Sequence, residues 1–246
     1  MPCSEQPIVI LGGFMSFSGF YASMRNALQV LTGQPTTVVD VQSLDWLPSL
    51  TLAGWRYLLD KLDARVQEAT LSSPTGKSTL VGHSAGGVLA RLYLSPCSFL
   101  GRTYSGLQLV DQLITLGSPH YNRQRWLHGG MLSRWVERRL PGARFSPAVQ
   151  YISVAGQLTH GRCHGSFAER QAYRFYQAIT REGNAWGDGL IPIQSALLQG
   201  ARHIVLDGVG HSPGFGGPWY GSEQVVPRWW AASIDSPNQD ASPAPP

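Results

Sequence analysis

The sequence predicts an α/β fold with a doubly wound, mostly parallel sheet of about six strands and a helical, lid-like insertion. Along most of the 246 residues, short apolar runs alternate with segments whose apolar residues recur at helical spacing. Strands that are separated by helices pair in parallel, because each helix carries the chain back to the same end of the sheet.

The predicted strands are short apolar runs, several of them rich in β-branched residues. They cover residues 7–11, 36–41, 78–81, 112–116, 149–154 and 203–206. The first run ends at Gly12 and Gly13, which indicates a buried strand followed directly by a loop.

Helices are predicted between these strands from amphipathic spacing and from their stop signals. They cover residues 20–31, 51–70, 86–95, 166–179 and part of 222–234. The segment 51–70 has the clearest pattern, because its apolar residues recur at steps of three and four. Gly33 stops the first helix, and Pro227 leaves the start of the last one open.

Length and composition indicate a single domain over residues 1–234. Apolar residues make up 43% of the chain and charged residues 14%, as in globular proteins. Two stretches interrupt the alternation, the lid-like insertion at 120–148 and a second excursion at 156–187. The tail 235–246, rich in proline, serine and alanine, is predicted to be disordered.

Cysteine usage and the lack of targeting signals predict a cytoplasmic protein. The three cysteines are few and odd in number, which fits a reducing compartment. No apolar run is long enough for a transmembrane helix, and the first residues lack the pattern of a signal peptide. His160, Cys163 and His164 lack a second ligand pair at zinc spacing, so no metal site is predicted.

The most informative motif is Gly82-His83-Ser84-Ala85-Gly86, between a strand-like run and a helix-like run. A serine at the apex of such a turn is typical of a nucleophile elbow. We expect strained backbone with positive φ at Ser84 and small neighbours that avoid collisions. The pattern recurs at residues 210–214, but proline and glycine prevent a helix there. Ser84 is therefore the predicted nucleophile, and Ser212 is a turn residue.

A serine nucleophile needs a base, and the base needs a carboxylate that orients it. On such a scaffold these groups follow the serine in the order acid, then histidine. His211, in a glycine-rich loop after the last strand, is the predicted base, and His203 is the weaker alternative. Asp188, 23 residues before His211, is the predicted acid. The remaining alternatives for the acid are Asp207, Asp111 and Asp40.

Two backbone N–H groups are expected to hold the oxyanion that acyl transfer generates. One belongs to Ala85, which directly follows the nucleophile. The other comes from the loop after the first strand, Gly12-Gly13-Phe14, where Phe14 is the candidate donor.

Several segments resemble those of the α/β-hydrolase superfamily, in particular its small bacterial lipases and esterases. Residues 188–192 and 200–211 are similar to the acid-to-histidine block of minimal lipases, and 116–120 resembles a Leu-Gly-Ser-Pro-His motif of many lipases. Residues 185–189 and 217–221 look like a group of cyanobacterial and plant-plastid α/β-hydrolases. One departure is Gly12-Gly13, where the family usually has His-Gly to brace the loop.

The resemblance implies an α/β-hydrolase fold and a serine hydrolase that cleaves lipid-like or acyl carboxylic esters through an acyl-enzyme. No metal or organic cofactor is expected. The alternatives are a thioesterase or acyltransferase that uses the same triad, or a non-catalytic binding protein built on this scaffold.

A basic patch suggests a partner beyond the substrate. Residues 120–144 carry six arginines against one glutamate, a net +5 in a chain of net +4. Because tryptophan and leucine are interspersed, we predict a lip that contacts an anionic apolar substrate or an anionic membrane. The alternative is a basic, solvated helix with a few core aromatics. No nucleic acid partner is expected. Five of the six arginines are assigned to the membrane contact, namely Arg123, Arg125, Arg134, Arg138 and Arg139.

Overall fold

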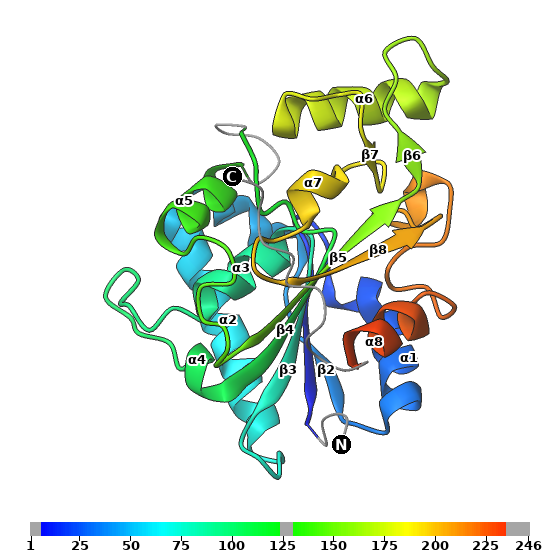
Figure 1. The fold of residues 1–246 in the computed structure, drawn as a ribbon. Coiled ribbons are helices and arrows are strands. Elements are labelled where there is room, and N and C mark those ends of the chain that lie inside the picture. The colour runs from blue at the N-terminus through cyan, green and yellow to red at the C-terminus, as the bar shows by residue number, and fades with distance from the viewer. Residues whose placement is uncertain (1–5, 124–129, 235–246) are drawn as a thin grey trace.

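Six parallel strands form one sheet in the order β2-β1-β3-β4-β5-β8 (Figure 1). The structure is a computed structural model that describes residues 6–123 and 130–234. The predicted α/β class and doubly wound parallel sheet are confirmed. The strands are β1 (Ile8–Leu11), β2 (Thr36–Val38), β3 (Ser78–His83), β4 (Val110–Leu116), β5 (Gln150–Gln157) and β8 (Arg202–Asp207).

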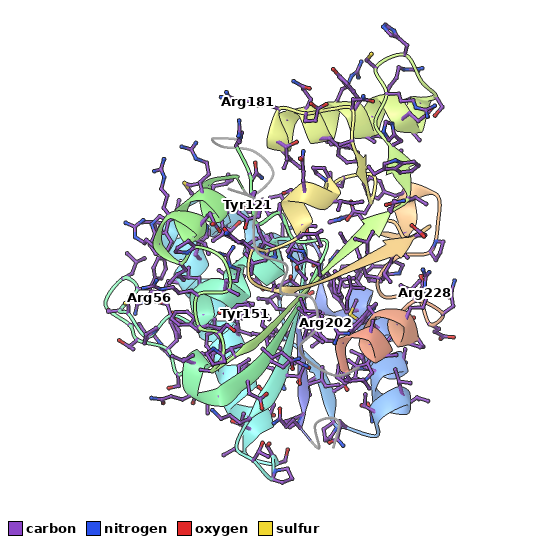
Figure 2. The ribbon with its side chains drawn as sticks, in the orientation of Figure 1. Arg56, Tyr121, Tyr151, Arg181, Arg202 and Arg228 are labelled. Atoms are coloured by element: carbon purple, nitrogen blue, oxygen red, sulfur yellow. The ribbon has the colours of Figure 1, made fainter. Side chains whose placement is uncertain are left out.

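Helices cover both faces of the sheet (Figure 1). One layer contains α1 (Ala22–Thr32) and α8 (Val226–Ile234). The other layer contains α2 (Leu52–Thr70), α3 (Ala85–Tyr93), α4 (Gly106–Leu109) and α5 (Gly130–Arg139). Figure 2 places Arg56 of α2 and Arg228 of α8 on opposite sides of the molecule.

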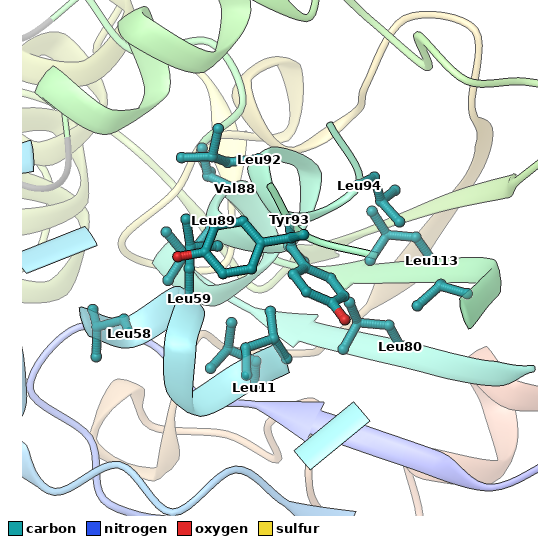
Figure 3. Close-up of a cluster of buried hydrophobic side chains, with 14 of the residues drawn as sticks. Leu11, Leu58, Leu59, Leu80, Val88, Leu89, Leu92, Tyr93, Leu94 and Leu113 are labelled. Atoms are coloured by element: carbon teal, nitrogen blue, oxygen red, sulfur yellow. The ribbon is translucent and has the colours of Figure 1, made fainter. Parts of the chain in front are cut away.

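The strands are apolar on both faces because each lies between two helical layers. In β1, Val9 and Leu11 pack into the cluster beneath α2 and α3, whereas Ile8 and Ile10 pack toward α1 and α8. Figure 3 shows Leu11 in the first cluster with leucines of α2, α3 and the neighbouring strands. Because successive residues pack against opposite helical layers, the strands appear in the sequence as continuous apolar runs.

The chain leaves the sheet toward opposite faces after β1 and after β3. After β1 it passes through the 3-10 helix η1 (Ser18–Tyr21) into α1, and after β3 it turns directly into α3. Parallel sheets open a crevice at the carboxyl ends of strands where the connections part in this way. Since β1 and β3 are adjacent, the loop after β1 lies beside the turn after β3.

The stretch 156–187 forms a small projection above the sheet (Figure 1). It holds β6 (Thr159–His160), α6 (Phe167–Thr180) and β7 (Trp186–Gly187), and β6 pairs with β7 in antiparallel fashion. The sequence predicted the helix but not these two short strands. The chain then reaches β8 through α7 (Ile193–Ala196), and η3 (Pro213–Phe215) follows β8.

The stretch 120–148 is built around α5, which packs on α3. Leu132 and Val136 of α5 are buried in the core, and Trp135 packs edge-on against Trp55 of α2. The described part of the predicted insertion therefore completes a core layer. Residues 124–129 and the tail 235–246 lie outside the described residues. Within the described ranges, no helix has the length and apolar content needed to cross a lipid bilayer.

Candidate active site

Ser84 stands on a strained turn between β3 and α3, with φ 54° and ψ −128°. This left-handed backbone is costly for a residue other than glycine. The turn is held by close backbone contacts, because a Cβ on Gly82 would collide with Gly87, and one on Gly86 with the carbonyls of Leu11 and Gly12. The positive φ and the small neighbours expected from the sequence are both present.

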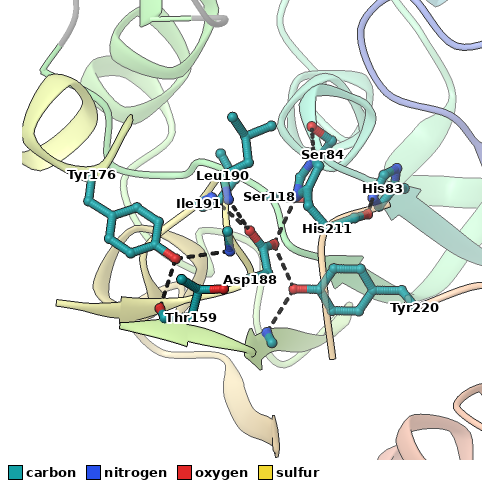
Figure 4. A network of polar contacts seen from close by, with 12 residues as sticks. His83, Ser84, Ser118, Thr159, Tyr176, Asp188, Leu190, Ile191, His211 and Tyr220 are labelled. Carbon is teal, nitrogen blue, oxygen red and sulfur yellow. Dashed lines mark hydrogen bonds and ion pairs between the residues drawn. The ribbon is translucent and has the colours of Figure 1, made fainter. Parts of the chain in front are cut away.

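The three predicted triad side chains lie in hydrogen-bond contact (Figure 4). Ser84 Oγ is 3.0 Å from His211 Nε2, and His211 Nδ1 is 2.8 Å from Asp188 Oδ2. Asp188 follows β7, and His211 lies in the loop between β8 and η3. The backbone N–H of His211 also donates to the Asp188 carbonyl at 2.9 Å. Asp188 and His211 are therefore joined through both side chain and backbone.

The residues that the sequence left as alternatives for the base, the acid and the nucleophile have other contacts. The Nε2 atom of His203 is 2.7 Å from the Leu198 carbonyl. Asp111 accepts a hydrogen bond from Gln6, and Asp40 accepts one from Gln42. The Asp207 carbonyl accepts from Arg228 at the end of β8. Ser212 is the residue before η3 and contributes to the pocket wall.

Four donors hold the buried carboxylate of Asp188. Its Oδ1 accepts from the N–H groups of Leu190 at 3.0 Å and Ile191 at 2.7 Å. Its Oδ2 accepts from Tyr220 Oη at 2.9 Å as well as from His211. Burial and the negative charge of Asp188 raise the pKa of Tyr220 well above its ordinary value, so this phenol stays protonated and donates. The carboxylate is thereby fixed in its plane.

Tyr220 was not singled out as a site residue by sequence reasoning. It lies inside residues 217–221, which drew attention only through a family resemblance. Its hydroxyl also accepts from the Gly156 N–H at 2.7 Å, which connects the end of β5 to the acid. The resemblance of residues 217–221 drew attention to this segment. The sequence does not show which carboxylate the tyrosine in it contacts.

A second hydrogen-bonded chain connects the loop after β1 to the loop of His211. Tyr21 Oη accepts from the Gly13 N–H at 2.8 Å and lies 2.8 Å from His83 Nδ1. His83 Nε2 lies 3.0 Å from the His211 carbonyl. Since a carbonyl only accepts, Nε2 carries the proton of a neutral His83, and Tyr21 donates to Nδ1.

The electrostatic environment agrees with this assignment. Burial, and then the proximity of His211, hold the pKa of His83 well below its ordinary value, so the ring stays neutral. Burial raises the pKa of Tyr21 to about 12, so its hydroxyl keeps its proton. These hydrogen bonds brace the Gly12-Gly13 loop, in which the sequence lacks the bracing histidine of the family that it resembles. Sequence reasoning missed both residues, because their contact spans 62 positions.

The two predicted oxyanion donors remain available. The Gly13 N–H is engaged by Tyr21, whereas within the described ranges neither the Phe14 nor the Ala85 N–H donates to a protein acceptor. Gly13 lies against Ser84, since a Cβ at Gly13 would be 3.3 Å from Ser84 Oγ. The Ser16 N–H closes the turn onto the Gly13 carbonyl at 3.1 Å, and Met15 adopts a strained φ of 61°.

An apolar pocket of about 330 Å³ opens beside Ser84. Its wall contains no aspartate, glutamate, lysine or arginine among the described residues. Such a pocket suits an uncharged, apolar substrate group. Besides three serines, two histidines and Gly13, the lining consists of apolar and aromatic residues: Phe14, Met15, Phe17, Phe20, Tyr21, Ala85, Pro119, Leu190, Ile191 and Phe215.

The arginine-rich stretch does not contribute to this wall. No described residue of 120–148 lines the pocket. Arg139 stacks on Trp135 with its guanidinium 4.1 Å from the ring centre, and the Arg123 N–H donates to the Ile179 carbonyl. Arg125 lies outside the described residues. The predicted contact with an anionic membrane stays a prediction, and the described part of the stretch does not border the pocket.

Comparison with known proteins finds similarity only at the level of structure. No family model matches the chain, and no curated protein matches it. A putative α/β-superfamily hydrolase from Xanthomonas campestris pv. campestris shares 16% identity over 93% of this chain and 94% of its own, with a TM-score of 0.44. The RedJ thioesterase of the prodiginine pathway in Streptomyces coelicolor shares 17% identity over 93% and 91%, with a TM-score of 0.46.

Aspergillus fumigatus lipase B is a third similar structure, at 12% identity over 80% of this chain and 44% of its own, with a TM-score of 0.48. The fold is assigned from structural features of this chain and not from these similarities. A parallel sheet, a strained serine turn after β3 and hydrogen-bonded serine, aspartate and histidine side chains in that chain order are the features of one scaffold. The chain therefore has the α/β-hydrolase fold that its sequence predicts.

Proposed function

We propose that this protein is a serine hydrolase that cleaves carboxylic esters through an acyl-enzyme on Ser84. The observation that carries the proposal is the continuous contact from Ser84 through His211 to Asp188. A serine hydroxyl is a weak nucleophile near neutral pH, and a base within hydrogen-bond distance removes that obstacle. The strained turn supports this role, because strain of this kind concentrates at functional sites.

The first half of the reaction transfers the acyl group to the enzyme. Ser84 Oγ forms a bond to the ester carbonyl carbon while its proton moves to His211 Nε2. The carbonyl oxygen becomes an oxyanion that accepts from the Phe14 and Ala85 N–H groups, and each such donor lowers the barrier by about 3 kcal/mol. The bond to the alkoxy oxygen then breaks, and the leaving alcohol takes the proton from His211.

The second half of the reaction returns the serine. A water molecule gives a proton to His211 Nε2 as its oxygen attacks the acyl carbon. The bond to Ser84 Oγ breaks, the serine regains its proton from His211, and a carboxylic acid is released. Asp188 accepts from Nδ1 throughout, which keeps the tautomer in which Nε2 is free to accept.

Chemical labelling with a fluorophosphonate probe tests the nucleophile. Wild type should be labelled, and Ser84→Ala should lose labelling together with on the order of 10⁴-fold or more of its p-nitrophenyl ester hydrolysis. Ser212→Ala is a matched control, because Ser212 also follows a Gly-His pair and lines the pocket. It should remain labelled and active. Labelling that survives in Ser84→Ala would exclude this serine as the nucleophile.

A further inference from the structure

A stripe of exposed leucines lies on the 3-10 helix η2 (Ser43–Leu50). Leu44, Leu47 and Leu50, called here the leucine stripe, expose 71%, 53% and 64% of their surface. Side chains three apart eclipse one another in a 3-10 helix, so these three share one face. Trp46 points the other way and is buried in the core. The helix therefore turns a continuous apolar face to solvent.

This exposure does not come from a loosely held segment. The Asp45 carboxylate accepts from the Gln42 N–H at 2.8 Å and from Tyr57 Oη at 2.9 Å, and it pairs with Lys61 at 3.0 Å. The indole N–H of Trp55 donates to the Ser49 carbonyl at 2.6 Å. These contacts fix η2 to α2. An anchored element that keeps large apolar side chains in water indicates a docking surface.

The helix that carries the leucine stripe packs against the mouth of the pocket through its buried face. The Phe14 ring packs edge-on against Trp46 of η2, with centroids 6.1 Å apart. The Ser18 N–H donates to the Val41 carbonyl at 3.0 Å, which joins the loop after β1 to the segment that leads into η2. Phe14, Met15 and Phe17 line the pocket, yet each leaves 43–47% of its surface exposed. Two exposed apolar sets, the leucine stripe and the pocket mouth, thus lie on neighbouring elements that contact each other.

The charges around this surface favour a neutral partner. The stripe itself has no ionisable side chain, and the nearest carboxylate, Asp45, is already paired with Lys61. We infer that the leucine stripe and the pocket mouth dock on an electrically neutral lipid surface, a vesicle or micelle that presents the ester to Ser84. The inference rests on the proposed function only in naming an ester as the molecule that the surface presents. Docking itself requires only the exposed apolar face.

Vesicle co-sedimentation tests the docking without catalysis. In a Ser84→Ala background, the protein should bind phosphatidylcholine vesicles, and adding Leu44→Ser, Leu47→Ser and Leu50→Ser should lower the partition coefficient about tenfold or more. The loss should persist at high salt, because apolar contact is not screened. The control carries Val30→Ser and Leu71→Ser, which remove even more exposed apolar side chains on α1 and after α2. It should bind normally.

An activity measurement separates docking from chemistry. With Ser84 intact, the triple leucine variant should hydrolyse a soluble short ester such as p-nitrophenyl acetate normally, but should be slower on an ester embedded in the vesicles. If wild type hydrolyses neither substrate, the proposed function fails while the sedimentation result still stands.

Three results would overturn the docking inference. The first is equal vesicle binding by the triple leucine variant and its parent. The second is binding that requires anionic vesicles and disappears in Arg134→Ser, Arg138→Ser, Arg139→Ser, which would assign docking to α5. The third is a dimer that the leucine substitutions dissociate, without any vesicle binding, which would assign the stripe to a second copy of the chain.

Discussion

At the scale of single residues, His211 is held from more directions than a triad alone requires. Its ring contacts Ser84 and Asp188, its backbone N–H donates to Asp188, and its carbonyl accepts from His83. Fixing both ring and backbone limits the number of orientations that the imidazole samples. The proposed base therefore loses less conformational entropy when it reaches the reactive geometry.

Tyr220 is expected to act as a positioning residue through Asp188. In Tyr220→Phe the carboxylate loses one of its donors, so we expect kcat to fall on the order of tenfold while KM changes little. The carboxylate becomes freer to stabilise a protonated His211. The acidic limb of the pH–rate profile should therefore move to higher pH. Steady-state kinetics across pH on a soluble ester measures both effects.

Tyr176→Phe is the matched control for this prediction. Each phenol accepts from a glycine N–H, Tyr220 from Gly156 at 2.7 Å and Tyr176 from Gly189 at 2.9 Å. Only Tyr220 donates to the carboxylate, since Tyr176 donates to the Thr159 carbonyl. An identical loss of kcat in both variants, with no movement of the acidic limb, would reduce Tyr220 to a purely structural role.

At the scale of elements, one buried arginine joins α3 to α5. Arg91 is buried, pairs with Glu137 at 2.9 Å and donates to the carbonyls of Leu140 and Gly142. Removing the carboxylate in Glu137→Ala leaves that charge with two backbone carbonyls and the neutral ring of His120 as its partners. Because Glu137 is partly exposed, we expect a loss of about 1–3 kcal/mol in the free energy of unfolding, measured by urea denaturation.

A surface pair provides the comparison for this loss. Glu68→Ala removes the partner of Arg65 on α2, an exposed pair 2.8 Å apart, and should change the stability little. Ester hydrolysis should survive in Glu137→Ala, because no residue of α5 lines the pocket. If the two variants unfold at the same urea concentration, Arg91 does not depend on Glu137.

Elements were predictable where local sequence pattern decides them. The glycines around Ser84 and the apolar runs before each loop revealed the strands, the sharp turn and the chain order of the three side chains. The strand ends were less predictable. β2 ends at Val38 rather than residue 41, because the chain bends away there and the Val41 N–H donates to Val39.

The contacts between distant elements were not predictable. The Tyr21–His83 and Tyr220–Gly156 hydrogen bonds span 62 and 64 positions, and no local pattern encodes them. The arginine-rich stretch shows the same limit. The composition of the stretch left open whether its aromatic residues face a substrate or the core. Trp135 packs on Trp55 and Phe99, which places the Trp135 side chain in the core.

At the scale of the whole molecule, two buried histidines connect protonation to folding. Burial, followed by the charges of neighbouring groups, holds the pKa values of His83 and His120 well below the ordinary value of 6.5. His120 lies between Arg91 and Thr115, and His83 between Tyr21 and the His211 carbonyl. Both rings are thus neutral in the folded protein, whereas in the unfolded chain each of the two takes up a proton as pH falls through 6.5.

Stability should therefore decline as pH falls below about 6.5, because these two rings gain protons there only in the unfolded state. Each histidine contributes a slope of up to about 1.4 kcal/mol per pH unit until its folded-state pKa is reached. Urea unfolding between pH 7.5 and 5 measures this slope. His120→Asn should reduce it by about half, whereas replacing the exposed His164 should leave it unchanged. An unaltered slope in His120→Asn would show that this ring takes up its proton without unfolding.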